Sequence, residues 1–198
     1  IGMNKFQNKY RISSTRLPHW DYRWAGAYFI TICTQNREHY FGEITNGKMI
    51  LSHTGVIADI LWHQIPYHTR HVELGEFVVM PNHVHGILII TQNASNVSGA
   101  DADTVETLHA TSLQTTPYPP QPRKNEQMAM ISPKSNSVST IIRSYKSAVS
   151  KHAHRLGYEF QWQPRFHDHI IRNEESFQNI SNYIINNPVN WQDDKYFI

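Results

Sequence analysis

The sequence has a single cysteine, Cys33, among its 198 residues. One cysteine cannot form an internal disulfide, which excludes a small secreted domain that is held together by disulfides. The chain also has no run of about 20 apolar residues, the length that spans a membrane, and no basic segment followed by an apolar one at its start. We therefore expect a soluble, cytoplasmic protein that contacts no membrane.

Motifs of several common enzyme classes are missing as well. The sequence has no phosphate-binding glycine-rich loop, no glycine-rich turn between a strand and a helix, and no serine elbow. Cys33 lies in the middle of a segment with the composition of a strand, where it is a core residue and not a nucleophile. These absences argue against a doubly wound nucleotide-binding fold and against a serine or cysteine hydrolase.

The small net charge of +2 hides a block structure. Residues 1–24 carry +4, residues 25–122 carry −5, residues 123–172 carry +6 and residues 173–198 carry −3. Both basic blocks are interleaved with aromatic residues, a combination that suits a phosphate backbone with bases that can stack. A solvated surface with chance clustering gives the same pattern, and the charge alone does not decide between the two.

The hydrophobic pattern predicts an α+β fold of one domain over residues 1–198. Strand-like runs occupy residues 27–34, 42–44, 48–51, 76–80 and 83–91, and helical periodicity occupies residues 55–67, 138–152 and 173–188. That order indicates an antiparallel sheet with helices packed on one face. Residues 1–24 form a basic N-terminal arm, and residues 93–137 form a long, polar, proline-rich insert.

The segment His83-Val84-His85 is the first candidate for chemistry. On a strand both imidazoles point to the same face and can reach one metal ion. The chain has 13 histidines and three His-x-His pairs, so the spacing alone is a weak signal. The pair 152/154 lies on a predicted helix and the pair 167/169 in a stretch without a clear pattern, which leaves only 83/85 on a strand. A metal site and a pair of ordinary sheet histidines both remain open.

The last predicted helix carries Tyr183 and Asn187, which lie four positions apart and so project from the same side about one turn apart. Both lie at the edge of the apolar face of the helix, where their side chains can point into a site under the sheet. Alternatively, Tyr183 is a boundary aromatic and Asn187 a helix-ending residue before Pro188. Tyr145 is a rival nucleophile on a basic helix, but it falls on the apolar face and has Val149, not a metal-ligand type, four positions later.

Cations within the basic blocks are candidates for contacts with the phosphates of a nucleic acid. Arginine binds phosphate through two parallel hydrogen bonds, and lysine binds it as a point charge. The residues that we select are Arg16, Arg143, Lys146, Arg165 and Arg172.

Five segments together resemble a known family, the REP-associated tyrosine transposases. These are relatives of the small single-tyrosine HUH insertion-sequence transposases. The resemblance covers about residues 11–92 and 138–192 and leaves out the insert. The segments that carry it are AYFITICT (27–34), VMPNHVHG (79–86), WQPR (162–165), HIIRN (169–173) and YIINNP (183–188).

The resemblance implies a ferredoxin-like sheet with the His-hydrophobic-His motif on a central strand, and a helix that bears one nucleophilic tyrosine. It implies that His83, His85 and Asn187 are ligands of a divalent metal, Mg²⁺ or Mn²⁺, and that Tyr183 is the nucleophile. The implied activity is DNA transposition and recombination. The enzyme would be an endonuclease and strand transferase that cleaves and rejoins single-stranded or hairpin DNA through a 5′-phosphotyrosine. Relatives occur as monomers and as homodimers.

Two other functions fit the residues. A non-catalytic nucleic-acid-binding module would use the same basic blocks and a ferredoxin-like sheet. A metal-dependent hydrolase would use His83 and His85 with water. A covalent adduct between protein and DNA distinguishes the strand transferase from both.

Overall fold

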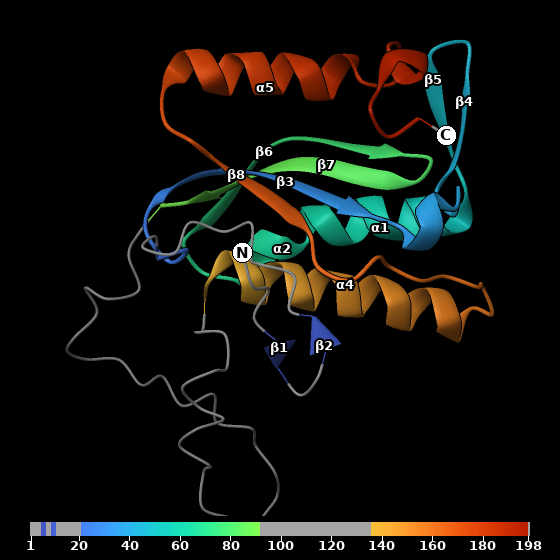
Figure 1. The fold of residues 1–198 in the computed structure, drawn as a ribbon, viewed down its shortest axis with the longest axis horizontal. Helices are drawn as coiled ribbons and strands as arrows, with labels where there is room; N and C mark the ends of the chain where they lie inside the picture. Colours follow the sequence, from blue (N-terminus) through green and yellow to red (C-terminus); the bar gives the residue numbers. More distant parts are fainter. Residues whose placement is uncertain (1–4, 7–8, 11–20, 92–135, 198) are drawn as a thin grey trace, which may run out of the picture.

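A four-stranded antiparallel sheet lies at the centre of the computed structural model (Figure 1). The structure describes residues 5–6, 9–10, 21–91 and 136–197. Most of the basic arm, including Arg16, and nearly all of the polar insert therefore lie outside the described residues. The strands of the sheet are β3 (Gly26–Cys33), β6 (Val72–Met80), β7 (His83–Ile90) and β8 (His167–Ile171). Their order across the sheet is β6-β7-β3-β8.

Helices cover both faces of this sheet (Figure 1). One face packs against α1 (His53–His63) and α4 (Val138–Arg155), and the short helix α2 (Ile65–His68) follows α1. The opposite face packs against α5 (Glu174–Asn186). In chain order the core consists of β3, α1, β6, β7, α4 and β8. This is the ferredoxin-like α+β arrangement that the resemblance implies. Helix α5 is an addition to it on the other face.

The alternation of apolar side chains on β3 explains this division. Tyr28, Ile30 and Ile32 are fully buried in the large core that also contains residues of α1 and α4. Phe29 points the other way and packs with Ile87, Ile171 and residues of α5. Because both faces of β3 are covered, it reads in the sequence as a nearly continuous apolar run.

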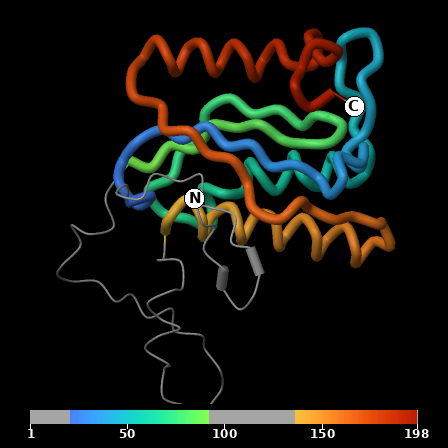
Figure 2. The backbone as a smooth tube through the Cα atoms, viewed as in Figure 1, coloured from blue at the N-terminus to red at the C-terminus, as the bar shows by residue number. Residues whose placement is uncertain are grey.

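Smaller elements join the strands of the core. The 3-10 helix η1 (Gln35–Arg37) follows β3, and the hairpin of β4 (Gly42–Thr45) and β5 (Lys48–Leu51) turns at Asn46 and Gly47, as predicted. A second 3-10 helix, η3 (Trp191–Asp193), follows α5, and β1 (Lys5–Phe6) pairs with β2 (Lys9–Tyr10). In Figure 2 the segment after α5 runs back beside the β4–β5 hairpin.

Gly86 allows β7 to approach the helical layer closely. A Cβ atom at this position would collide with the ring of Trp62 on α1, and it would lie 2.9 Å from the ring of Phe77. The rings of Trp62 and Phe77 are stacked with centroids 4.7 Å apart. Trp62 is fully buried, so no room exists for it to move aside.

Side-chain caps fix where the two long helices begin. The Thr140 N–H donates to Ser137 Oγ at the start of α4, and the Ser176 N–H donates to Asn173 Oδ1 at the start of α5. Asn173 is thus the cap that the sequence predicts, and Glu174 and Glu175 follow it in the first turn. None of the helices in the described part of the chain has the length and apolar character needed to cross a membrane.

Candidate active site

Strand β7 places His83 and His85 on the same face of the sheet, because alternate residues of a strand point in the same direction. Their ring centroids lie 4.4 Å apart, and both residues are fully buried. Val84 points to the opposite face and joins the core beneath α1 and α4. The two imidazoles therefore share one buried site on the side of the sheet that α5 covers.

The ring of His83 is fixed by its neighbour in the chain. His83 Nδ1 lies 2.8 Å from Asn82 Oδ1, and the Asn82 amide nitrogen donates to the Tyr196 carbonyl over 2.9 Å. Asn82 Oδ1 is therefore the acceptor, and His83 Nδ1 carries the proton. His83 Nε2 is left with a free lone pair, and this buried atom has no hydrogen-bond partner among the described residues. A neutral histidine binds a metal ion in this tautomer.

His85 is held between the sheet and α5. Its Nδ1 atom lies 2.9 Å from Oγ1 of Thr31, the residue directly opposite on β3. Its Nε2 atom lies 3.2 Å from the hydroxyl of Tyr183. The imidazole thus faces the helix that carries the predicted nucleophile.

Burial keeps both histidines neutral. It lowers the pKa of His83 from 6.5 to about 3, and the positive charges of Arg37 and Lys195 act in the same direction. Burial likewise lowers the pKa of His85 far below its ordinary value, with a further contribution from His83. At neutral pH both imidazoles are consequently uncharged, so each ring has one nitrogen with a lone pair.

Helix α5 presents Tyr183 at the edge of the site. Phe177, Ile180 and Ile184 pack this helix on the sheet, which leaves Tyr183 39% exposed at the rim. The Tyr183 hydroxyl donates to Asp194 Oδ2 over 2.7 Å. Burial raises the pKa of Tyr183 above its ordinary value, and the hydrogen bond to Asp194 raises it further. The phenol is therefore protonated at neutral pH.

Asn187 lies one helical turn after Tyr183 and reaches the same carboxylate. It is 2% exposed, and its Nδ2 donates to Asp194 Oδ2 over 2.7 Å. Its other side-chain atom, Oδ1, is buried without a partner among the described residues. The structure thus brings together the four residues predicted from the sequence, His83, His85, Tyr183 and Asn187.

Sequence reasoning missed a fifth residue of this site, Asp194. It follows η3 in a segment without periodic pattern, so only its acidic side chain could have drawn attention to it. The Tyr196 N–H donates to Asp194 Oδ1 over 2.7 Å, which orients the carboxylate toward Tyr183 and Asn187. In the described part of the chain, His83, His85 and Asp194 are the one group of three metal-ligand types, with ligand atoms all within 4.8 Å of one another.

This donor set fits a divalent cation. It combines two neutral imidazoles and a carboxylate, and Asn187 offers a buried amide oxygen nearby. Among the described residues neither His83 Nε2 nor Asn187 Oδ1 has a hydrogen-bond partner. Nitrogen and oxygen ligands of this kind suit several divalent metals and do not select strongly among them.

The rival nucleophile Tyr145 lies on the other side of the sheet. It is 3% exposed, its ring packs edge-on against Trp62, and its hydroxyl donates to the Ala58 carbonyl over 3.0 Å. Burial raises the pKa of Tyr145 far above its ordinary value. This tyrosine is a core residue, remote from His83 and His85.

Comparisons with known proteins place the chain among relatives. A protein of Haemophilus influenzae, itself uncharacterized, is 36% identical over 186 residues, which cover 93% of this chain and 92% of that protein. The chain belongs to the same family as that protein. No family model matches the sequence. A solved structure of a REP-associated tyrosine transposase bound to a REP hairpin matches 93% of this chain and 77% of that one, with a TM-score of 0.54 and 19% identity.

The chain has the same fold as this transposase. The resemblance that the five sequence segments carry is thereby confirmed at the level of the fold. Within this transposase fold, the His-x-His pair lies on β7, one of the two inner strands of the sheet, and Tyr183 lies on the helix added to the ferredoxin-like core.

The predicted DNA-binding cations of this transposase fold lie on both of its sides. Arg143 is exposed on α4, in the helical layer remote from Tyr183. The ammonium of Lys146 donates to the carbonyls of Gln163 and Arg165, so it holds the loop before β8. Arg165 is exposed on that loop, and Arg172 is exposed where β8 leads into α5.

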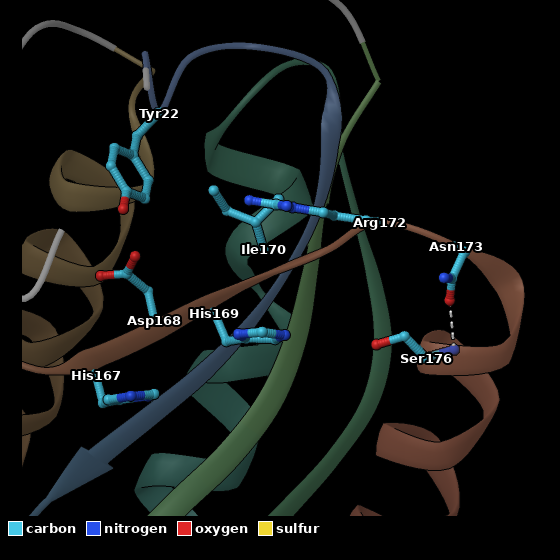
Figure 3. A pocket seen from close by; sticks show the side chains of 8 residues that line it. All are labelled: Tyr22, His167, Asp168, His169, Ile170, Arg172, Asn173 and Ser176. Atoms are coloured by element: carbon cyan, nitrogen blue, oxygen red, sulfur yellow. Dashed lines mark hydrogen bonds between the residues drawn. The ribbon is translucent and has the colours of Figure 1, made fainter. Parts of the chain in front are cut away.

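A cavity of about 560 Å³ lies where β8 meets the start of α5 (Figure 3). His167 and His169 project into it from the same side of β8, and Arg172 lines it as well. His167 pairs with Thr31 on β3, which in turn pairs with His85, so a row of side chains on one face connects this cavity to the buried histidines. Strand β8 was not predicted, and it places the pair 167/169 in regular structure.

Proposed function

We propose that this chain is a metal-dependent DNA strand transferase. It cleaves and rejoins single-stranded, hairpin-forming DNA through a 5′-phosphotyrosine intermediate on Tyr183. In this proposal residues 1–198 form one domain, and residues 173–188 are the nucleophile helix.

One observation carries the proposal. The hydroxyl of the half-exposed Tyr183 lies 3.2 Å from Nε2 of the buried His85, and His83, two positions earlier on the same strand, has an Nε2 lone pair with no hydrogen-bond partner among the described residues. A tyrosine with a merely structural role does not need a pair of neutral, buried imidazoles beside it. Exposure of the ring at the rim allows a DNA strand to reach the oxygen, while the imidazoles stay shielded from water.

The residues supply the steps of a phosphoryl transfer. Tyr183 oxygen attacks the phosphorus, and its proton passes to Asp194 Oδ2, to which the hydroxyl already donates. The bond between phosphorus and the 3′ oxygen breaks, and the 3′ oxygen takes a proton from solvent. The product is a 5′-phosphotyrosine with a free 3′ hydroxyl. Attack of a second 3′ hydroxyl on this linkage reverses the step and joins two strands without nucleotide hydrolysis.

A divalent cation, Mg²⁺ or Mn²⁺, held by His83, His85 and Asn187, would neutralise charge on the phosphate oxygens. Asn187 and Tyr183 lie on one rigid helical turn, so a ligand atom and the nucleophile keep a fixed spacing. Fixed spacing between the reacting groups is a large part of the rate advantage in such reactions.

The DNA partner is proposed from charge and from the solved relative, which is bound to a REP hairpin. Arg16, Arg143, Lys146, Arg165 and Arg172 are the proposed phosphate contacts, and the protein acts as a monomer or homodimer in the cytoplasm.

The test is formation of a covalent adduct on a hairpin oligonucleotide that has a single-stranded flank and a label at its 3′ end. With Mg²⁺ or Mn²⁺ present, the labelled strand should migrate with the protein in a denaturing gel. Cleavage by water without an adduct would favour a metal-dependent hydrolase, and binding without cleavage would favour a nucleic-acid-binding module.

A further inference from the structure

Arg37, which the proposed reaction does not use, has an unusual backbone. It ends η1, directly after β3, and has a φ of 60°, while the preceding Asn36 has a φ of 52°. Two consecutive residues other than glycine in the left-handed region cost of order 1 kcal/mol or more each, and such residues concentrate at functional sites. This turn directs the side chain of Arg37 toward the residues that follow η3.

The guanidinium of Arg37 has no acidic partner in the part of the chain that the structure describes. Its Cζ atom lies 4.4 Å from the centroid of the Tyr196 ring. Its Nη1 atom is buried and makes no hydrogen bond to any described residue. The ion pairs among the described residues are Arg23–Asp21 and His63–Asp59, and neither involves Arg37. A buried charged donor that stays unpaired is costly, and the five N–H groups of a guanidinium are made to bind oxygens in a fork.

This unpaired cation lies beside the buried histidines. The Tyr196 ring, on which Arg37 packs, has its centroid 4.6 Å from that of His83. Arg37 is also close enough for its charge to lower the pKa of His83. A second cation, Lys195, lies 4.9 Å from the same Tyr196 ring centroid. Two positive charges thus lie near His83, and both contact one aromatic ring.

We propose that Arg37 is a substrate-positioning residue that binds a phosphate of the DNA strand adjacent to the phosphate attacked by Tyr183, with Lys195 as a second contact. A planar guanidinium binds two phosphate oxygens at once, so it fixes the strand in direction as well as in place. The assignment rests on the proposed function, because it needs a DNA strand that passes Tyr183 near the end of β7 that carries His83. It adds a contact outside the basic blocks from which the sequence selects DNA-binding residues.

The first test measures binding without cleavage. A single-stranded oligonucleotide of about 12 thymidines is titrated by fluorescence anisotropy at several salt concentrations, with a chelator present so that no reaction occurs. Loss of one phosphate contact should reduce the slope of log K against log salt by about 0.7. We expect this reduction and a roughly tenfold weaker affinity for Arg37→Gln, and a smaller loss for Arg37→Lys, which keeps the charge but not the fork.

Arg70→Gln is the matched control, because Arg70 is exposed before β6, at the end of the sheet remote from His83. Its slope should equal that of the unchanged protein. If Arg37→Gln lowers the thermal midpoint but leaves the salt slope unchanged, Arg37 only packs on Tyr196 and the assignment is wrong, while the proposed function stands. If the unchanged protein does not bind the strand at all, the proposed function fails and this assignment fails with it.

The second test locates the phosphate. On a hairpin oligonucleotide whose cleaved linkage has been mapped, single neutral methylphosphonate linkages replace the phosphates on either side of it. At one flanking linkage the unchanged protein should lose about tenfold in affinity, and Arg37→Gln should lose nothing further there. Equal losses for the two proteins at every linkage would overturn the assignment.

Discussion

The burial of His83 makes the stability of the fold depend on pH. Its pKa is about 3 in the folded protein and 6.5 ordinarily, the value expected in the unfolded chain. Between these values the unfolded chain binds a proton at this position and the folded protein does not, so stability falls as pH falls. From pH 7 to pH 5 the loss from His83 alone is about 2 kcal/mol. His85 adds a loss in the same direction, because burial lowers its pKa as well.

Urea denaturation at pH 7, 6 and 5, with a chelator present, measures this loss. His83→Gln removes one of the two titrating groups and should make the fall in unfolding free energy clearly shallower. His68→Gln, at an exposed position on α2, should leave the profile unchanged. A flat profile in the unchanged protein, or equal slopes for the protein and His83→Gln, would mean that these imidazoles are accessible to water and protons in the folded state.

Three further predictions concern the nucleophile, the packing and the metal. Tyr183→Phe removes only a hydroxyl, so it should eliminate the covalent adduct while DNA affinity stays within about twofold. The control Tyr67→Phe, at an 86% exposed position, should still form the adduct. An adduct with Tyr183→Phe would refute the assignment of the nucleophile. Gly86→Ala forces a methyl group against Trp62 and should lower the unfolding free energy by about 2 kcal/mol in urea; an unchanged midpoint would contradict the close approach. Mn²⁺ at roughly 100 times its dissociation constant should stabilise the protein by about 2.7 kcal/mol in thermal denaturation. A similar gain in His83→Ala would show that Mn²⁺ binds elsewhere.

The elements with a clear period could be predicted from the sequence. Strand β7 is apolar with alternating histidines at one end, and helices α4 and α5 have apolar residues at helical spacing after good caps. Strand β8 was missed because His167–Ile171 is short and mixes charged with apolar residues. It is a strand because β3 offers a complete set of pairing partners from Ala27 to Thr31, and that is a long-range effect.

The site could be predicted only where it lies on regular structure. Period two on β7 placed His83 and His85 together, and a spacing of four on α5 paired Tyr183 with Asn187. The directions of the Asp194 and Arg37 side chains could not be predicted in this way. Each residue lies in or next to a short 3-10 helix, where the sequence has no repeating pattern that indicates where a side chain points. The sequence also could not predict which face of the sheet α5 covers. Both faces are apolar, and an apolar stripe on a helix fits either of them.

The hydrogen bonds that build the site join very distant parts of the chain. His85 and Tyr183 are 98 positions apart, and Asn82 and Tyr196 are 114 positions apart. A nascent chain leaves the ribosome from its N-terminus, and its early segments can fold first. The ferredoxin-like core is complete once β8 has emerged, whereas Tyr183, Asn187 and Asp194 are still to come. Each new molecule therefore passes through a stage with a folded core and an unassembled site, and the site is complete only after translation has proceeded beyond Tyr196.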